Sequence, residues 1–221
     1  MSGFMPTRRR EHISADAPGV RELLQMLTYR RPAWSNTEEA FIKRFIVPTG
    51  ALPDEFGNYW LTIGDSCPIL WSSHTDTVHK TKGNQKVLYG LNVASTDESN
   101  CLGADDTAGV WLMIQMIRAG VPGTYVFHRG EEIGGLGSEY IAKHTPERLH
   151  GIEFAIAFDR KGTTDIITHQ YSRTCSDRFA AELVRCLPSM GLSPCSKGIF
   201  TDTQHYAHLI PECTNVSVGY F

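Results

Sequence analysis

The sequence lacks the long apolar runs of a membrane protein. No stretch approaches the roughly 20 apolar residues that a transmembrane helix requires, and residues 1–14 contain no hydrophobic core of the kind found in signal peptides. We therefore expect a cytoplasmic protein that has no membrane partner. The basic run Arg8-Arg9-Arg10 is expected to belong to a solvated N-terminal tail.

An excess of charge of one sign is also absent. The 221 residues include 21 Lys and Arg and 24 Asp and Glu, which gives a net charge of −3. Proteins that bind nucleic acid usually carry a strongly basic surface, so this balance argues against a nucleic-acid partner. The six cysteines form neither a C-x-x-C pair nor a dense framework, and we expect them to be reduced thiols.

Three common catalytic signatures are missing as well. There is no Gly-x-Ser-x-Gly nucleophile elbow, no phosphate-binding loop, and no Gly-x-Gly-x-x-Gly that follows a strand. The run Gly130–Gly137 is rich in glycine, but Glu131 and Glu132 within it would repel a phosphate group. The sequence thus argues against a serine hydrolase of that type and against a nucleotide-binding site.

Apolar patterns typical of helices and strands alternate along the chain. Helices are predicted at residues 20–27, after a capping box at 35–38, and at 109–117, 138–143 and 178–187. Strands are predicted at residues 59–63, 68–73, 123–128, 154–158 and 214–218, with loop or hairpin from 79 to 101. This alternation predicts an α/β fold, in which a mostly parallel mixed sheet is covered by helices on both faces. At this length and with no linker, one domain over residues 1–221 is expected.

Acidic and histidine residues follow several of the predicted strands or precede the helix at 109–117. The segments are Ser73-His74-Thr75-Asp76, Leu102-Gly103-Ala104-Asp105-Asp106, Gly130-Glu131-Glu132 and Phe158-Asp159. In an α/β sheet, functional groups gather where the strands end. Each carboxylate alone is typical of a surface loop, but unpaired charges beside apolar elements are costly. Because imidazole together with carboxylates suits zinc, manganese or cobalt, the four segments predict a metal site.

His74 and Asp76 have a spacing with a specific use. Residues i and i+2 of an extended chain point to the same side, so the Asp76 side chain can accept a hydrogen bond from the His74 ring nitrogen that does not face the metal. Such a contact orients the ring and increases its basicity. The adjacent pair Glu131-Glu132 is more typical of a solvated surface when it occurs alone, and its meaning depends on the order of all four segments.

Taken in that order, the motifs resemble those of the co-catalytic di-zinc exopeptidases. This group includes aminopeptidases, tripeptidases, carboxypeptidases and deacylases that share a phosphorylase/hydrolase-like catalytic domain. The resemblance covers roughly Pro68 to Phe221. It rests on four motifs, which are Ser73-His74-Thr75-Asp76-Thr77, Leu102-Gly103-Ala104-Asp105-Asp106-Thr107-Ala108-Gly109, Gly130-Glu131-Glu132-Ile133-Gly134 and Phe158-Asp159.

The resemblance implies a role for each matched residue. By position, His74 and Asp159 would bind one zinc ion, Asp105 would bridge two zinc ions, and Glu132 would bind the second. Glu131 would be the general base, and the peptide bond between Asp105 and Asp106 would be cis. Two metal ions ~3.5–4 Å apart can activate a water molecule and polarise a carbonyl group. A free glutamate beside them can pass the proton from that water to the leaving amine.

One ligand that the family requires is missing. The family places a histidine on the second zinc a few residues past the last strand, whereas here the predicted strand near Asn215–Tyr220 is followed only by Phe221. We expect the sequence as given to be truncated at its C-terminus, and the native protein to continue beyond Phe221 and to supply that histidine within the next few residues. As given, the chain is expected to bind one metal ion firmly and the second weakly, with cobalt or manganese as alternatives to zinc.

The remaining histidines are the alternative source of the missing metal ligand. His205 and His208 are predicted to lie in a helix, and His79 and His128 lie near the motifs. All four are expected to be surface or packing residues. If the chain binds two metal ions tightly, His205, His208 or another side chain has to be the additional ligand.

The expected activity is removal of N-terminal residues from peptides. The residues after Asp159 are too few for an inserted lid domain, which favours the aminopeptidase branch of the family. An amidohydrolase or deacylase that acts on N-acyl amino acids is the alternative with the same fold. The alternative from a different functional class is a non-catalytic relative whose set of metal ligands is incomplete.

Overall fold

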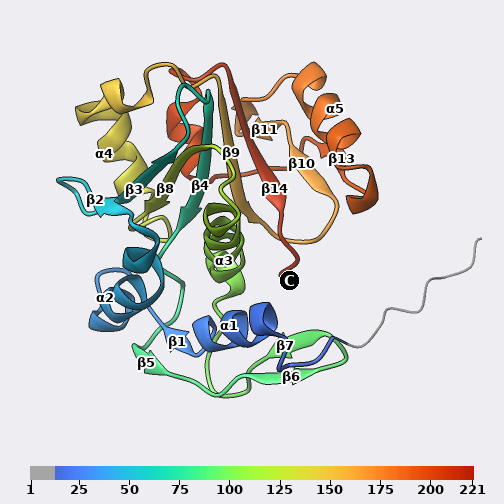
Figure 1. Ribbon diagram of the computed structural model, residues 1–221. Coiled ribbons are helices and arrows are strands. Elements are labelled where there is room, and N and C mark those ends of the chain that lie inside the picture. Colours follow the sequence, from blue (N-terminus) through green and yellow to red (C-terminus); the bar gives the residue numbers. More distant parts are fainter. Residues whose placement is uncertain (1–12) are drawn as a thin grey trace, which may run out of the picture.

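Eight strands form the central sheet of the computed structural model, which describes residues 13–221 (Figure 1). In spatial order the strands are β13 (Ser193–Cys195), β10 (Asp165–Ile167), β14 (Glu212–Ser217), β9 (Phe154–Arg160), β4 (Ile69–His74), β8 (Gly123–His128), β3 (Tyr59–Ile63) and β2 (Leu52–Pro53). The middle strands β14, β9, β4 and β8 are parallel to one another. β3 and β2 add antiparallel pairs beside β8, and β10 is antiparallel to β14. The predicted α/β class with a mostly parallel mixed sheet is confirmed.

Helices cover both faces of this sheet. They are α1 (Pro18–Met26), α2 (Asn36–Phe41), α3 (Ala104–Arg118), α4 (Leu136–His144) and α5 (Asp177–Cys186), with short 3-10 or π segments η1 (Ile42–Ile46), η2 (Val47–Thr49), η3 (Pro146–Leu149), η4 (Pro188–Met190) and η5 (Asp202–Tyr206). Successive strand residues point to opposite faces. Tyr125 and Trp71 therefore pack in the core formed with α1, α2 and α3, while Leu70 and Val126 pack in the core beside α4 and η5.

Local chemistry explains where the first helices begin. Pro18 occupies the first turn of α1, where its missing N–H costs no helical hydrogen bond. The Ser35 side chain accepts a hydrogen bond from the Glu38 N–H at the start of α2, as the capping box predicts. The Glu38 carboxylate does not return to Ser35, because it accepts a hydrogen bond from the Trp34 N–H at 2.6 Å. The predicted apolar face of this helix is buried, although its second half is the π segment η1.

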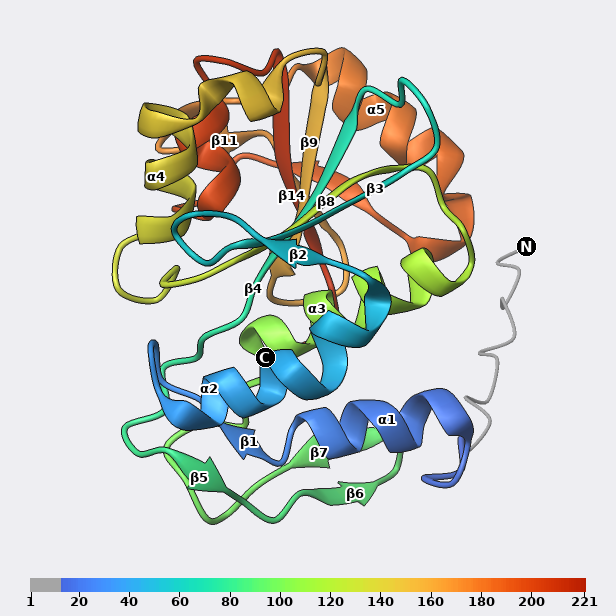
Figure 2. The ribbon, with the colours of Figure 1, turned by 60° about the vertical axis from the view of Figure 1, so that its left-hand side comes forward.

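The stretch between β4 and α3 forms a separate small layer. It contains β5 (Gly83–Asn84) and the hairpin of β6 (Leu88–Gly90) and β7 (Val93–Ser95), and β5 pairs with β1 (Tyr29–Arg30). Figure 2 shows these strands beside α1 and away from the central sheet. A third small pair is β11 (His169–Gln170) with β12 (Ser172–Arg173). Among residues 13–221, no helix combines the length and the apolar character needed to cross a membrane.

Most predicted elements occur within a few residues of their expected bounds. β3 and β8 coincide with the predicted ranges, whereas α3 starts at Ala104, earlier than predicted, because its first turn is acidic and lacks apolar periodicity. The edge strand β13 and its neighbour β10 were not predicted, since strands of 3 residues are too short to show alternation. The helix expected around His205 and His208 is only the 3-10 segment η5, which leaves His208 outside it. The Arg8-Arg9-Arg10 run lies outside the described residues.

Candidate functional site

The ends of parallel strands bring the four acidic and histidine motifs together. β4 ends at His74, β9 carries Asp159 next to its end, and Glu131 and Glu132 follow β8. α3 contributes Asp105 from its first turn. His74 Nε2 lies 3.1 Å from Asp105 Oδ1, 3.6 Å from Asp159 Oδ1 and 3.9 Å from Glu131 Oε2. Residues that are far apart in the sequence thus surround one buried imidazole.

The donor atoms of this group fit a divalent metal ion. His74, Asp105 and Asp159 each offer one ligand atom, and these atoms all lie within 4.8 Å of one another. An imidazole with carboxylates is a donor set that suits zinc, manganese or cobalt. Glu132 Oε1 is buried and has no hydrogen-bond partner within residues 13–221. A buried unpaired oxygen is costly, and a cation nearby would satisfy it.

Asp76 is fully buried and contacts both His74 and the turn after β8. His74 Nδ1 lies 3.1 Å from the Asp76 carbonyl oxygen and 3.5 Å from its carboxylate, so the backbone makes the shorter contact. The Asp76 carboxylate accepts hydrogen bonds from the backbone N–H groups of Gly130, Glu131 and Glu132, at 3.1, 3.1 and 3.2 Å. Burial raises the pKa of Asp76, but the contacts with His74 and the backbone outweigh it and lower the pKa overall. Asp76 therefore holds the turn that carries both glutamates, a role that its spacing from His74 did not predict.

The start of α3 has the backbone that the resemblance implied. The peptide bond between Asp105 and Asp106 is cis. The buried Asp106 carboxylate accepts hydrogen bonds from the His74 N–H at 3.2 Å and from the Gly109 N–H at 2.9 Å. A Cβ atom at Gly109 would lie 2.1 Å from the Phe158 carbonyl oxygen, so a glycine is required for α3 to approach β9 this closely. This approach places Asp105 beside Asp159.

Two hydroxyl groups that sequence reasoning did not single out hold the carboxylates of Asp159 and Asp105. The Thr201 hydroxyl donates to Asp159 Oδ2 at 2.6 Å. The Tyr220 hydroxyl lies 3.0 Å from Asp105 Oδ2 and 2.8 Å from the Asp159 carbonyl oxygen. Asn215 Oδ1 also accepts a hydrogen bond from the Asp159 N–H, at 2.9 Å. A polar Asn in a buried strand was the only signal in the sequence, and nothing local marked Thr201 or Tyr220.

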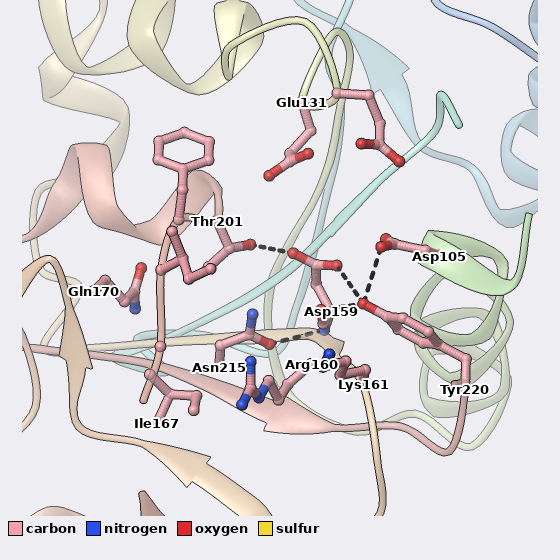
Figure 3. A pocket seen from close by; sticks show the side chains of 14 residues that line it. Asp105, Glu131, Asp159, Arg160, Lys161, Ile167, Gln170, Thr201, Asn215 and Tyr220 are labelled. Carbon is pink, nitrogen blue, oxygen red and sulfur yellow. Dashed lines mark hydrogen bonds between the residues drawn. The ribbon is translucent and has the colours of Figure 1, made fainter. Parts of the chain in front are cut away.

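These groups line one side of a cavity of about 320 Å³ (Figure 3). The acidic side carries Asp105, Asp159 and the two glutamates. The other lining residues are Arg160, Lys161, Ile167, Gln170, Gly198, Ile199, Phe200, Thr201, Asn215 and Tyr220. Lys161 forms no ion pair with any residue in the described part of the chain, whereas Arg160 donates to the Asp165 carboxylate at 3.0 and 2.9 Å. The cavity therefore combines a potential metal site with an unpaired cation.

Burial and mutual contacts change the protonation of the site. Burial raises the pKa of Glu131 to about 9 and that of Glu132 to about 7; the carboxylate of Asp159 adds to both shifts, and His74 opposes them. Burial lowers the pKa of His74, but its hydrogen bonds, first to Asp105 and then to Asp159, outweigh burial and raise that pKa well above the ordinary value. The protein groups alone therefore hold protons that a bound cation would displace.

The other histidines do not join this group within the described residues. His79 Nδ1 contacts the Thr77 hydroxyl at 2.7 Å, and His205 Nδ1 contacts the Ser138 hydroxyl at 2.9 Å. His128 is fully buried, with Nε2 2.6 Å from the Tyr206 hydroxyl and Nδ1 3.2 Å from the Asp202 carboxylate. These three have packing or hydrogen-bonding roles in the fold.

Comparisons with known proteins agree with this architecture. No protein-family model matches the sequence, and no curated protein matches it. The aminopeptidase PepT from Bacillus cereus is similar, with 24% identity and a TM-score of 0.55 over 68% of this chain and 45% of that one. The TET1 peptidase from Pyrococcus horikoshii has 16% identity and a TM-score of 0.62, over 89% of this chain and 90% of that one. A glutaminyl cyclase from Macrostomum lignano has 13% identity and a TM-score of 0.58, over 92% and 78%.

These likenesses show a shared fold. The chain spans less than half the length of PepT and of a tripeptidase from Staphylococcus aureus, since it covers 45% of each. Identities from 13% to 24% establish the architecture and leave substrate and mechanism open. The similar structures include an aminopeptidase, a tripeptidase and a further peptidase, and the likeness to them is one of fold.

Proposed function

We propose that this chain is a zinc-dependent exopeptidase of the aminopeptidase kind. The observation that carries the proposal is the convergence of the buried His74 ring with Asp105 and Asp159, two carboxylates that line the cavity, and with the Glu131 carboxyl group 3.9 Å from the His74 ring. This arrangement supplies a place for a metal ion and a carboxyl group beside it that is not required as a ligand. The fold shared with known peptidases supports the same activity.

The metal ligands are His74, Asp105 and Asp159, with Glu132 available as a further ligand. A divalent metal ion bound there supplies a Lewis acid that polarises a carbonyl group and lowers the pKa of water toward ~7. The carboxylates of Asp105 and Asp159 are held by the hydroxyls of Tyr220 and Thr201, so the ligand oxygens are oriented before a metal ion binds.

Glu131 is proposed to move the proton. Its carboxyl group accepts the proton from a water molecule that attacks the scissile carbonyl, and then delivers it to the leaving amine. Burial raises the pKa of Glu131 to about 9 when only protein groups act on it, and a nearby cation would lower that pKa toward neutrality. A carboxyl group with a pKa near neutrality can both accept and donate a proton. Asp76 keeps Glu131 in place through the Glu131 N–H.

One observation favours a second candidate, an amidohydrolase of N-acyl amino acids. Such substrates carry a free carboxylate and no amine, and Lys161 is an unpaired cation that lines the cavity. Comparing hydrolysis of amino-acid anilides with that of N-acetyl amino acids separates the two candidates. If the second candidate is correct, Lys161→Met raises KM for N-acetyl amino acids.

The proposed function is tested by removing the metal ion and by substituting each of the two glutamates. A chelator should abolish hydrolysis of anilides and dipeptides, and added zinc, cobalt or manganese should restore it. Glu131→Gln should retain metal but lose a factor of ~10² or more in kcat, which is the usual scale for a general base. Glu132→Gln is the matched variant and should instead reduce metal content. Full hydrolysis after metal removal would contradict the proposal, and metal loss in Glu131→Gln would exchange the two roles.

A further inference from the structure

Tyr220 approaches the metal-ligand group from a segment that is tightly fixed. The Val218 N–H donates to the Arg160 carbonyl oxygen at 2.9 Å, and the Gly219 N–H donates to the Gly162 carbonyl at 2.8 Å. The Gly162 N–H in turn donates to the Tyr220 carbonyl at 2.7 Å. The backbone at 218–220 is therefore bound to the backbone that follows Asp159, and the Tyr220 ring points from it toward Asp105 (Figure 3).

The two oxygens of Asp105 have different partners. Oδ1 lies 3.1 Å from His74 Nε2, which is the nearest approach of this carboxylate to the ring. Oδ2 lies 3.0 Å from the Tyr220 hydroxyl, whose single proton is shared between Oδ2 and the Asp159 carbonyl oxygen at 2.8 Å. Asp105 would have to contact both metal ions in a two-metal site. Its Oδ1 faces His74 and the first metal position, whereas its Oδ2 already has a hydrogen-bond partner.

A second metal ion would need the oxygen that Tyr220 holds. The remaining acidic ligand beside Asp105 is Glu132, whose Oε1 is buried and has no partner in residues 13–221. A cation between Glu132 and Asp105 would use Asp105 Oδ2, since Oδ1 faces His74. It would then lie close to the positively polarised hydrogen of the Tyr220 hydroxyl, which the cation repels.

We propose that the Tyr220 hydroxyl competes with a second metal ion for Asp105 Oδ2, so that the chain binds one metal ion tightly and a second only weakly. Tyr220 acts as a positioning residue, because it acts through the carboxylate of Asp105, which it orients toward His74. The inference rests on the proposed metal site but does not depend on peptide hydrolysis.

The test is a zinc titration of metal-stripped protein against a chromophoric chelator, which measures each binding step without an activity assay. The wild-type chain should show one tight equivalent and one weak equivalent. Tyr220→Phe keeps the ring and removes the hydroxyl, and it should tighten the second step ~10-fold or more, because hydrogen bonds to charged groups are among the stronger ones. Thr201→Val is the matched control: it removes a hydroxyl from Asp159, and it should weaken the first step and leave the second unchanged.

A measurement on the unmutated side chain covers the case in which Tyr220→Phe does not fold. In protein labelled with fluorotyrosine, one of the eight tyrosine fluorine resonances should shift with the second equivalent of zinc and not with the first. Two tight equivalents in the wild-type chain would overturn the inference. A second step that is unchanged or weaker in Tyr220→Phe would also overturn it, and a weaker step would make Tyr220 a metal ligand.

Failure of this inference can be distinguished from failure of the proposed function. If zinc binds in this pattern but no peptide or N-acyl substrate is hydrolysed, the proposed function fails and the role of Tyr220 stands. If His74→Ala binds zinc as tightly as the wild-type chain, the metal site itself is wrong and both proposals fail.

Discussion

Asp76 shows how one buried carboxylate can organise two parts of a site. It contacts the His74 ring on one side and three consecutive backbone N–H groups on the other. The second set of contacts fixes the turn at Gly130 and so the directions of Glu131 and Glu132. A carboxylate that accepts several N–H groups is stabilised in its charged form, which agrees with the lowered pKa of Asp76.

The role of Asp76 leads to a prediction about metal affinity. Asp76→Asn should leave the fold intact but weaken zinc binding by ~10–100-fold, because an amide offers one acceptor oxygen instead of two to the turn that carries the glutamates and removes the negative charge beside the His74 ring. Zinc titration of metal-stripped protein measures this change. Asp97→Asn, at an exposed position, is the control and should bind zinc like the wild-type chain. Equal affinity in both variants would return Asp76 to the status of an ordinary carboxylate.

The protonation of the ligands predicts how zinc affinity depends on pH. The pKa of His74 is raised well above its ordinary value and that of Glu132 is about 7, so zinc must displace protons near neutral pH. Affinity should therefore increase with pH and fall as pH is lowered from 8 to 6, by ~10-fold per pH unit for each proton released. Calorimetric titration in buffers with different ionisation enthalpies counts these protons. Glu132→Gln should release fewer of them, and an affinity that does not change with pH would contradict the assignment.

At the scale of elements, a buried ion pair ties α2 to the ends of β4 and β8. Glu38 is fully buried, and its carboxylate accepts hydrogen bonds from Arg129 at 2.8 and 3.2 Å and from the Thr75 hydroxyl at 2.6 Å. Thr75 directly follows β4, the strand that ends at His74. Arg129 directly follows β8 and begins the turn that carries the two glutamates. α2 thus supports the edge of the sheet at which the proposed metal ligands lie.

This ion pair predicts a large effect on stability. Glu38→Ala should lower the free energy of unfolding by ~3–5 kcal/mol, because it leaves the Arg129 guanidinium buried without its main partner. Glu39→Ala removes an exposed partner of the same guanidinium and should cost less than ~1 kcal/mol. Denaturant unfolding of both variants measures the difference. Similar losses in the two variants would show that burial of Glu38 is not what makes the pair important.

At the scale of the whole molecule, the proposed metal site connects two parallel strands with α3. Its ligands come from β4, β9 and the start of α3, and the hydroxyls that hold them come from residues near η5 and after β14. A ligand that binds only the folded chain stabilises it against unfolding. A metal ion here would therefore hold together elements from most of the sequence.

Zinc should accordingly raise the melting temperature of the chain. Free zinc at 100 times its Kd stabilises by ~2.7 kcal/mol, which corresponds to a shift of ~5–10 °C for a protein of this size. Thermal unfolding with and without zinc measures the shift, and His74→Ala should show almost none. An equal shift in His74→Ala would place zinc elsewhere on the chain.

The sequence by itself determined the class of fold and identified the histidine and acidic residues of the four motifs. Apolar periodicity predicts strands β3 and β8 and the central parts of the main helices. This periodicity depends on how each single element is buried, so it can be read without knowing which elements are its neighbours. The four motifs follow strand ends or begin a helix, so their positions were also visible locally. The roles of Glu131 and Glu132 remain predictions.

Only the tertiary structure decided which side chains surround the ligands. Tyr220 is separated from Asp105 by 115 residues and Thr201 from Asp159 by 42, and no local pattern relates such positions. The contact of Tyr220 exists because β14 pairs with β9 and because residues 218–220 bind the backbone at 160–162. The backbone contacts of Asp76 likewise depend on β4 lying beside β8. Strand order is a property of the folded chain, since it depends on how all the apolar faces are buried together.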